Sequence, residues 1–188
     1  DNNIKAIETG TWPHTVSLPA GALARGTITN GSITGCEAMS GSAVYVGDSA
    51  IFSGSTDSES TGFTVTGNNV TDIDSGAIQG AKLYFEGNVT VRNNTCEGDT
   101  VAHDVVLAAN SNTVIYTTTN GLSVNADIGV YVADSNSAYA NHGKEAQPFG
   151  TFGTNDGNAY LERFINDRET ELRGCQLSDG FIHWGIYI

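Results

Sequence analysis

Residues 63–92 read FTVTGNNVTDIDSGAIQGAKLYFEGNVTVR, and this stretch decides the fold. Short runs of Thr, Val, Ile, Tyr and Phe alternate in it with Gly, Asn, Ser and Asp, a pattern typical of short β-strands joined by turns. Three such runs, around Val65, Ile78 and Phe85, follow one another before the pattern begins again at Val91. The stretch therefore predicts one complete repeat of an all-β fold.

The same three runs recur on both sides of this stretch. The aligned positions are Ile33, Val65 and Val91 in the first run, Val44, Ile78 and Val105 in the second, and Phe52, Phe85 and Tyr116 in the third. The spacing between them varies, as expected where turns differ in length but strands stack in register. The repeat predicts a parallel β-helix with three-faced coils, in which Asn68 and Asn94 occupy equivalent turns and stack their side-chain amides.

The composition agrees with an all-β protein and excludes several partners. The chain has 8 Lys+Arg against 21 Asp+Glu, a net charge of −13, so nucleic acid and anionic membrane surfaces are poor partners. No apolar stretch is long enough to span a membrane. The three cysteines, Cys36, Cys96 and Cys175, leave one thiol unpaired in any pairing, and we expect buried free thiols, with one bridge as the alternative.

Alternation within the strands predicts which side chains face outward. In the third run the alignment turns Phe52, Phe85 and Tyr116 inward, and the residue before each of them then points outward. The predicted exposed positions, which are also the candidate binding residues, are Tyr45, Ile51, Tyr84, Val106 and Ile115. Such apolar rows mark partner surfaces, unless the C-terminal segment with Tyr139 and Phe149 folds back over them.

The two ends of the stack need covering. We expect an irregular first coil near Trp12 and a last coil from Leu122 through Val124 to Val132, which gives a β-helix over residues 1–132. Residues 133–188 then form a C-terminal α/β cap with a helix over 158–166 and strands over 170–174 and 180–188. A separate small domain is the alternative, but so short a segment makes a marginal core.

At these motifs a family resemblance appears. Ser75-Gly76-Ala77-Ile78 followed by Phe85-Glu86-Gly87-Asn88 resembles the repeat pair of chlamydial polymorphic outer-membrane proteins. Residues 104–116 and 121–130 are similar to the β-helix repeats of very large Gram-positive surface proteins. The resemblance implies a right-handed parallel β-helix outside the cell that adheres to or holds a partner, without catalytic residues. Cys36, where Asn is usual, and Gln79-Gly80, where Tyr-Val is usual, depart from the pattern.

The residues offer little for an enzyme. Lys82 and Arg92 are the basic residues of the repeat region and lie on different predicted faces, and Asp72 and Asp74 form a solvated turn rather than a catalytic pair. His103 is expected to be an ordinary surface histidine. The four histidines have no metal-ligand spacing, so we predict no metal and no cofactor.

These observations predict a non-enzymatic, monomeric module on a bacterial surface or secreted from the cell. Its partner would be a host protein, with immunoglobulins, mucins and matrix proteins all open, or a glycan. A structural spacer in a large surface protein is the alternative, and a polysaccharide lyase or hydrolase fragment is a third.

Overall fold

The computed structural model describes residues 16–18, 26–38, 43–55, 62–107, 114–133, 150–151, 162–176 and 181–186. Strands dominate these ranges, and the one helical feature among them is a short 3-10 turn at Glu162–Arg163. The prediction of an all-β protein is therefore confirmed.

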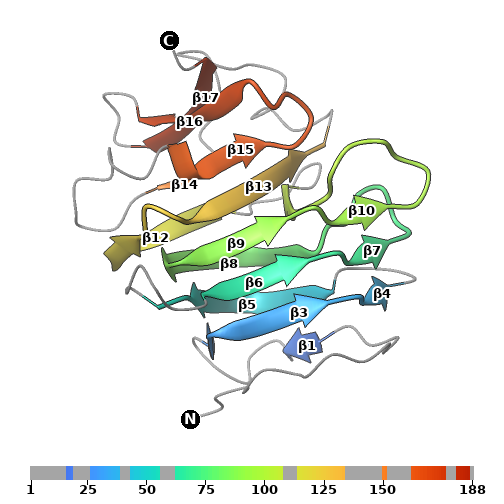
Figure 1. The fold of residues 1–188 in the computed structure, drawn as a ribbon, viewed down its shortest axis with the longest axis horizontal. Helices are drawn as coiled ribbons and strands as arrows, with labels where there is room; N and C mark the ends of the chain where they lie inside the picture. Colours follow the sequence, from blue (N-terminus) through green and yellow to red (C-terminus); the bar gives the residue numbers. More distant parts are fainter. Residues whose placement is uncertain are drawn as a thin grey trace.

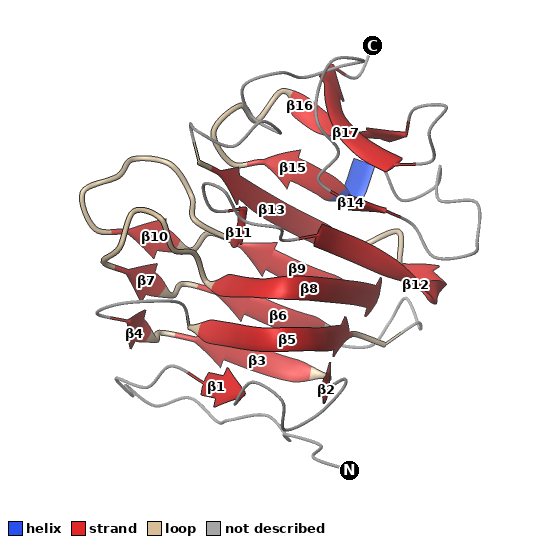
Figure 2. Cartoon of the chain, turned by 180° about the vertical axis from the view of Figure 1, so that it is seen from behind, coloured by secondary structure: helices blue, strands red, loops and turns tan. Residues whose placement is uncertain are grey.

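Most strands lie in three stacks of parallel strands (Figure 1). The front stack contains β3 (Gly31–Thr34), β6 (Phe63–Thr66), β9 (Val89–Arg92) and β13 (Asp127–Val132). The rear stack, nearest the viewer in Figure 2, contains β1 (Val16–Leu18), β2 (Gly26–Thr29), β5 (Val44–Ser53), β8 (Ile78–Gly87) and β12 (Val114–Leu122). The side stack contains β4 (Glu37–Ala38), β7 (Asn69–Val70) and β10 (Thr95–Cys96). Three successive runs of the chain, β2–β3–β4, β5–β6–β7 and β8–β9–β10, therefore each add one strand to each stack.

The C-terminal strands join the front and rear stacks at one end. β14 (Gly150–Thr151) pairs in parallel with β12, and β15 (Phe164–Asn166) pairs in parallel with β13. β16 (Leu172–Gln176) and β17 (Phe181–Ile186) pair antiparallel with each other and link these two strands. The result is one mixed, 14-stranded sheet that runs from β1 through these strands to β3. The predicted strands over 170–174 and 180–188 correspond to β16 and β17, whereas the division at residue 132 stays a prediction.

The predicted register is confirmed at all but one of its alignments. The structure pairs Ile33 with Val65 and Val65 with Val91, Val44 with Ile78 and Ile78 with Val105, and Phe52 with Phe85. Tyr116 is the exception, because it pairs with Tyr84 and leaves Thr117 opposite Phe85. The sequence does not show this shift, because Val114, Ile115 and Tyr116 are apolar in succession and fit either register. The residue that turns inward opposite Phe85 is Thr117, which is only 3% exposed.

The core is made of the side chains that alternate strand residues point inward. In β6 and β9 buried and half-buried residues alternate strictly, as a strand with one buried face requires. The aromatic rings of Phe52 and Phe85 stack at 5.3 Å in adjacent layers, and Phe63 lies 5.7 Å from Phe52. Like residues thus stack on like residues from one pass to the next.

Gly80, which stands where the resembling repeats have Val, is explained by a steric constraint. Gly80 pairs with Val46, and a Cβ added to it would lie 2.6 Å from the Val46 Cβ. The register between β5 and β8 shifts immediately after this pair. A glycine therefore lets two long strands bend at the same place without a collision.

The helix predicted for the C-terminal half is wrong. The expected helix over 158–166 is, in its described part, the short 3-10 turn at Glu162–Arg163 followed by strand β15. In that strand Phe164 and Asn166 turn inward on either side of Ile165, and the strand pairs with both β13 and β16. In the segment predicted as the last coil, Leu122 and Val132 are buried, and Val124 is 71% exposed in the turn between β12 and β13. Trp12, Tyr139 and Phe149 lie outside the described residues.

A column of buried hydrogen bonds runs along the corner between the front and side stacks. The backbone N–H of Cys36 donates to Asn68 Oδ1 at 3.0 Å, the N–H of Asn68 donates to Asn94 Oδ1 at 3.1 Å, and the side-chain amide of Asn68 donates to the same Asn94 oxygen at 2.8 Å. Asn68 and Asn94 are each only 1% exposed. The predicted stacking of their amides is therefore confirmed.

Left-handed residues make this column repeat. Gly35, Gly67 and Asn93, which precede Cys36, Asn68 and Asn94, have φ values of 66°, 65° and 60°. This backbone conformation favours Gly and Asn, and it turns the following side chain back into the corner. The corner therefore has the same geometry in three successive passes.

We predict that Asn68→Ala lowers the free energy of unfolding by about 2–4 kcal/mol, because it leaves buried polar groups above and below without partners. Urea unfolding measures the change. Asn69→Ala is the matched control, since the side chain of Asn69 bonds only the exposed Thr95 hydroxyl among the contacts described and should cost less than about 0.5 kcal/mol. Equal losses for the two variants would contradict the importance of the column.

Candidate functional sites: an outer face and a buried charge cluster

The outer face of the rear stack carries two of the predicted binding residues, Ile51 and Tyr84, and Tyr116 occupies the place predicted for Ile115. Ile51 pairs with Tyr84, and Tyr84 pairs with Tyr116, so these three side chains form the outward column. All three are half-buried. Ile115, predicted to complete the column, is fully buried, because the register of β12 differs by one residue from the prediction. The inward position predicted for Tyr116 is therefore wrong.

Of the other two residues predicted to face outward, Tyr45 is exposed and Val106 is buried. Tyr45 is 41% exposed on β5, as expected for an outward residue. Val106 in β11 (Val105–Leu107) is fully buried, and its Cβ would lie 3.1 Å from a Cβ added to Gly76. β11 pairs with β13 as well as with β8, so both its edges are occupied. The exposure predicted for Val106 is therefore wrong.

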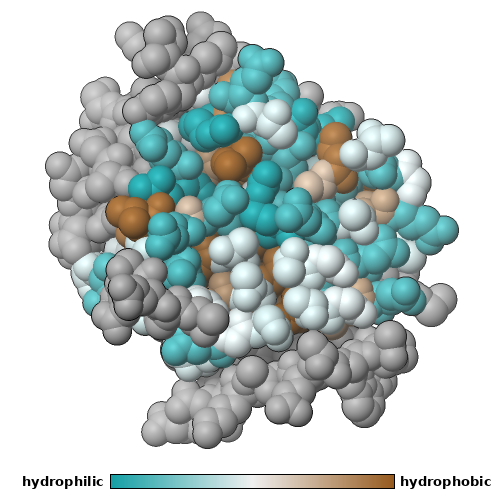
Figure 3. Space-filling view, in the orientation of Figure 1, coloured by the Kyte–Doolittle hydropathy of each residue, from teal (hydrophilic) through white to brown (hydrophobic). Residues whose placement is uncertain are grey.

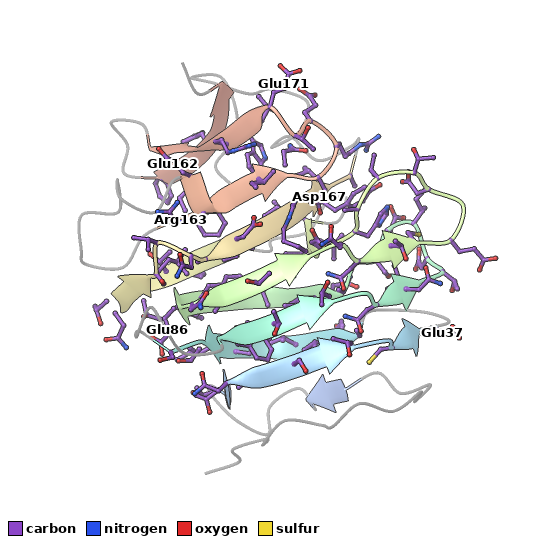
Figure 4. The ribbon with its side chains drawn as sticks, in the orientation of Figure 1. Glu37, Glu86, Glu162, Arg163, Asp167 and Glu171 are labelled. Atoms are coloured by element: carbon purple, nitrogen blue, oxygen red, sulfur yellow. The ribbon has the colours of Figure 1, made fainter. Side chains whose placement is uncertain are left out.

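The aromatic column lies next to a polar one. The rings of Tyr84 and Tyr116 stack at 4.6 Å with an interplanar angle of 16°. Two residues further along β8 than Tyr84, the Glu86 carboxylate accepts hydrogen bonds from Ser53, Thr118 and Asn120. Glu86 is labelled in Figure 4. The face thus combines flat aromatic contact area with a fixed carboxylate.

The front stack presents a different surface. Its outward positions include Ser32, Thr64 and Thr90, which pair with one another across three strands. Figure 3 shows this side of the molecule as mostly pale and teal, with small separate hydrophobic patches. Among the described elements, the rear stack therefore carries the more aromatic face.

A cluster of buried charges lies where the asparagine column ends. Asp104 accepts hydrogen bonds from the Asn94 backbone N–H at 3.0 Å and from its side-chain amide at 2.7 Å. The backbone N–H of Asp104 in turn donates to Asp167 Oδ2 at 3.0 Å. The side chains of both aspartates are 0% exposed. The carboxylates of Asp104 and Asp167 therefore continue the column of buried acceptors that begins with the amides of Asn68 and Asn94.

Arg92 lies between these carboxylates. Its guanidinium is 3.1 Å from Asp167 and 3.5 Å from Asp104, and its Nε is 3.6 Å from Asp127. Gly129, which occupies the next position of the stack, makes room for the group, since an added Cβ would collide with Asp104, Asp167 and Arg92 together. The guanidinium of Arg92 is therefore shared by three carboxylates.

The buried environment shifts the pKa values of Asp104 and Asp167. Burial raises the pKa of Asp104, against the effect of its hydrogen bonds from Asn94 and of the Arg92 charge. Burial raises the pKa of Asp167 well above its usual range, and the neighbouring Asp104 charge adds to the shift. Desolvation of the charged form therefore outweighs the attraction of the guanidinium.

His103 is fully buried, so the prediction of a surface histidine is wrong. Its Nδ1 lies 2.8 Å from the Ser75 carbonyl oxygen and its Nε2 lies 3.0 Å from Asp99 Oδ2, two groups that only accept. The ring stacks at 3.7 Å on Tyr131. The hydrogen bond from His103 lowers the pKa of Asp99. His103 thus ties the turn after β10 to the body of the fold.

The thiols of Cys36 and Cys96 are free, as expected. Burial raises the pKa of both, and nearby carboxylates raise that of Cys96 further. The thiolate form that gives cysteine its reactivity is therefore disfavoured at both positions. Nothing is described of the Cys175 side chain.

The remaining candidates are quickly placed. Asp72 and Asp74 are exposed in one turn, where the Asp72 carboxylate accepts the Asp74 N–H at 3.0 Å. Within the described ranges, no three His, Cys, Asp or Glu side chains gather as a metal site requires. Across the same ranges, no helix has the length and hydropathy for crossing a bilayer.

Comparison with known proteins gives no relative: no family model, no curated protein and no solved structure matches the chain.

The sequence contained a signal for Asp167 that pattern reading missed. Cys36, Asn68 and Asn94 each follow an inward apolar residue by three positions, and Asp167 follows Phe164 in the same way. No comparable signal marks Asp104, which reaches the column from the turn that precedes β11.

We predict that Arg92→Met lowers the free energy of unfolding by about 3–5 kcal/mol, because it removes the cation from two buried carboxylates. Chemical denaturation measures the change. Lys82→Met, which removes the same charge at an exposed position of β8, is the control and should shift stability by no more than about 0.5 kcal/mol. A small loss for Arg92→Met would show that the cluster does not depend on its cation.

Proposed function

We propose that this protein is a non-enzymatic binding module of a bacterial cell surface, which captures an extracellular host protein on the outer face of its rear stack. In this proposal the three parallel stacks are the faces of a right-handed parallel β-helix, and the C-terminal strands from β14 onward are its cap.

The β-helix is supported by the order in which the stacks are visited. β6, β7 and β8 follow one another in the chain, and each pairs in parallel with the strand one pass earlier in its own stack. Repeated passes of this kind build a rigid support whose faces stay flat and whose outward side chains recur at the strand spacing of about 4.8 Å.

The single observation that carries the binding proposal is the column of Ile51, Tyr84 and Tyr116, with the exposed Tyr45 six positions before Ile51 on β5. Tyrosines on a rigid face add large contact areas at a small cost in side-chain entropy, which is why binding surfaces are rich in them. Lys82 and Glu86 add charges of both signs to the same face. This mixture suits a protein partner.

A protein fits this face better than a glycan does. Sugars pack against the open face of an aromatic ring, but Tyr84 and Tyr116 turn ring faces toward each other at 4.6 Å. The edges of half-buried rings suit contact with peptide groups and side chains. Immunoglobulins, mucins and matrix proteins are therefore the first candidates.

The absence of catalysis in this proposal rests on the burial of the charge cluster. Asp104 and Asp167 are the adjacent carboxylates with shifted pKa values, and their side chains are closed to solvent. A substrate would have no access to them without a change of structure.

The test is binding of the immobilised domain to a panel of purified immunoglobulins, mucins, matrix proteins and glycans. We expect saturable binding to one protein and a loss of about tenfold or more in affinity for Tyr45→Ala and for Tyr116→Ala, as for contact residues at the centre of an interface. Thr66→Ala, on the front stack, is the matched control and should bind as the unaltered chain does.

Unchanged affinity in both tyrosine variants would reject this face as the binding surface. Saturable binding to a glycan alone would reject a protein as its occupant. Failure to bind any member of the panel would instead favour a structural spacer, whose rigid stacks only project neighbouring domains.

A further inference from the structure

Asp167 connects the C-terminal strands to residues far away in the sequence. It follows β15 directly, and its carboxylate contacts Arg92 and the backbone of Asp104, which are 75 and 63 positions away. Figure 4 shows Asp167 near the ends of β9, β13 and β15. The buried cluster therefore lies at the junction between β15 and the parallel stacks.

The charges at this junction do not balance. Asp104, Asp127 and Asp167 surround the single guanidinium of Arg92. Arg168, the nearest further cation of the described chain by sequence, points elsewhere: it donates to the Val132 carbonyl oxygen and lies over the Tyr131 ring. The His103 ring lies within hydrogen-bond distance of Asp99 and of the Ser75 carbonyl oxygen rather than of this cluster, and Glu169 would only add negative charge. Two buried carboxylates beside one shared cation leave an excess negative charge in a dry site.

We propose that Asp104 and Asp167 retain one proton between them, and that this proton latches β15, β16 and β17 onto β13. Loss of the proton as the pH rises leaves two like charges side by side, weakens the contact of Asp167 with the stacks and favours opening of the C-terminal strands. The module would therefore hold its C-terminal strands closed in acidic surroundings and loosen them as the surroundings become more alkaline.

The direction of this dependence follows from the two carboxyl groups. Because their pKa values are raised in the folded chain, the folded state keeps a proton that the unfolded state has already lost. Their contribution to stability is present at acidic pH and is lost as the pH rises through the folded-state pKa.

A second carboxylate acts in the opposite direction at a different place. The pKa of Asp99 is lowered by its hydrogen bond from His103, so its contribution is present above the unfolded pKa and is lost as the pH falls through the folded value. Asp99 belongs to the turn after β10, and its carboxylate bonds His103 rather than a strand of the C-terminal group. The pH dependence due to Asp99 can therefore be told from that due to Asp104 and Asp167 by the segment of the chain in which it appears.

Amide hydrogen exchange as a function of pH tests the proposal on the whole chain, with intrinsic exchange rates subtracted. We expect the protection of residues 164–176 to fall with rising pH by up to about tenfold per pH unit, the limit for release of one proton, while β5 and β8 change little. Asp167→Asn, a neutral side chain of the same shape, should keep this segment protected with no pH dependence.

Asp104→Asn removes the other carboxylate and should also abolish the dependence, which keeps the test decisive if Asp167→Asn fails to dock. Asp127→Asn is the control: its side chain is 46% exposed, and the wild-type dependence should persist. Infrared spectroscopy of the unaltered chain should show a carboxylic acid band that remains after the exposed carboxyl groups have ionised.

Three results would overturn the proposal. Protection of residues 164–176 that does not vary with pH in the unaltered chain is one, and a wild-type slope in both asparagine variants is the second. The third is the absence of the persistent carboxylic acid band. Because none of these measurements involves a binding partner, their outcome is independent of the function proposed for the rear stack.

Discussion

The register of the whole fold depends on one corner, where buried side-chain oxygens accept backbone N–H groups from the preceding level. Cys36, Asn68, Asn94 and Asp104 each donate in this way to the next member of the column, which ends at Asp167. A buried N–H without an acceptor is costly, so a slip of one residue would break several bonds at once. Apolar stacking supplies the driving force for packing, whereas this column selects a single alignment.

The chemistry of the column changes where its geometry changes. In the first passes a left-handed residue turns the chain, and an asparagine with a donor and an acceptor fits between two levels. β13 instead runs straight from its pairing with β9 to its pairing with β11, so Tyr131 stands where the next asparagine would be. Asp104 and Asp167 supply the acceptors at these last levels, and the negative charge they introduce requires Arg92.

The same regularity that buries the core also produces the two outer faces. Every inward residue of a strand fixes an outward neighbour, and stacking brings equivalent neighbours together. This process gives hydroxyl groups on the front stack and an aromatic column on the rear stack. A binding face on such a support needs no loop to be ordered by the partner, so its contact residues are preorganised. The β-helix and the host-protein partner remain proposals that follow from this arrangement.

The sequence by itself determined the all-β class, the three runs of each repeat, the pairing of Ile33, Val65 and Val91, and the asparagine column, because period and turn chemistry are local properties. Tertiary structure alone decided the rest. Successive apolar residues around Ile115 fit either strand face, and only pairing with β8 chose between them. The 158–166 segment has apolar residues compatible with a helix, but β13 offered it an open edge. The charge cluster joins Arg92, Asp104 and Asp167 from three distant segments, and no local pattern encodes such a meeting, since it exists only once the passes have stacked.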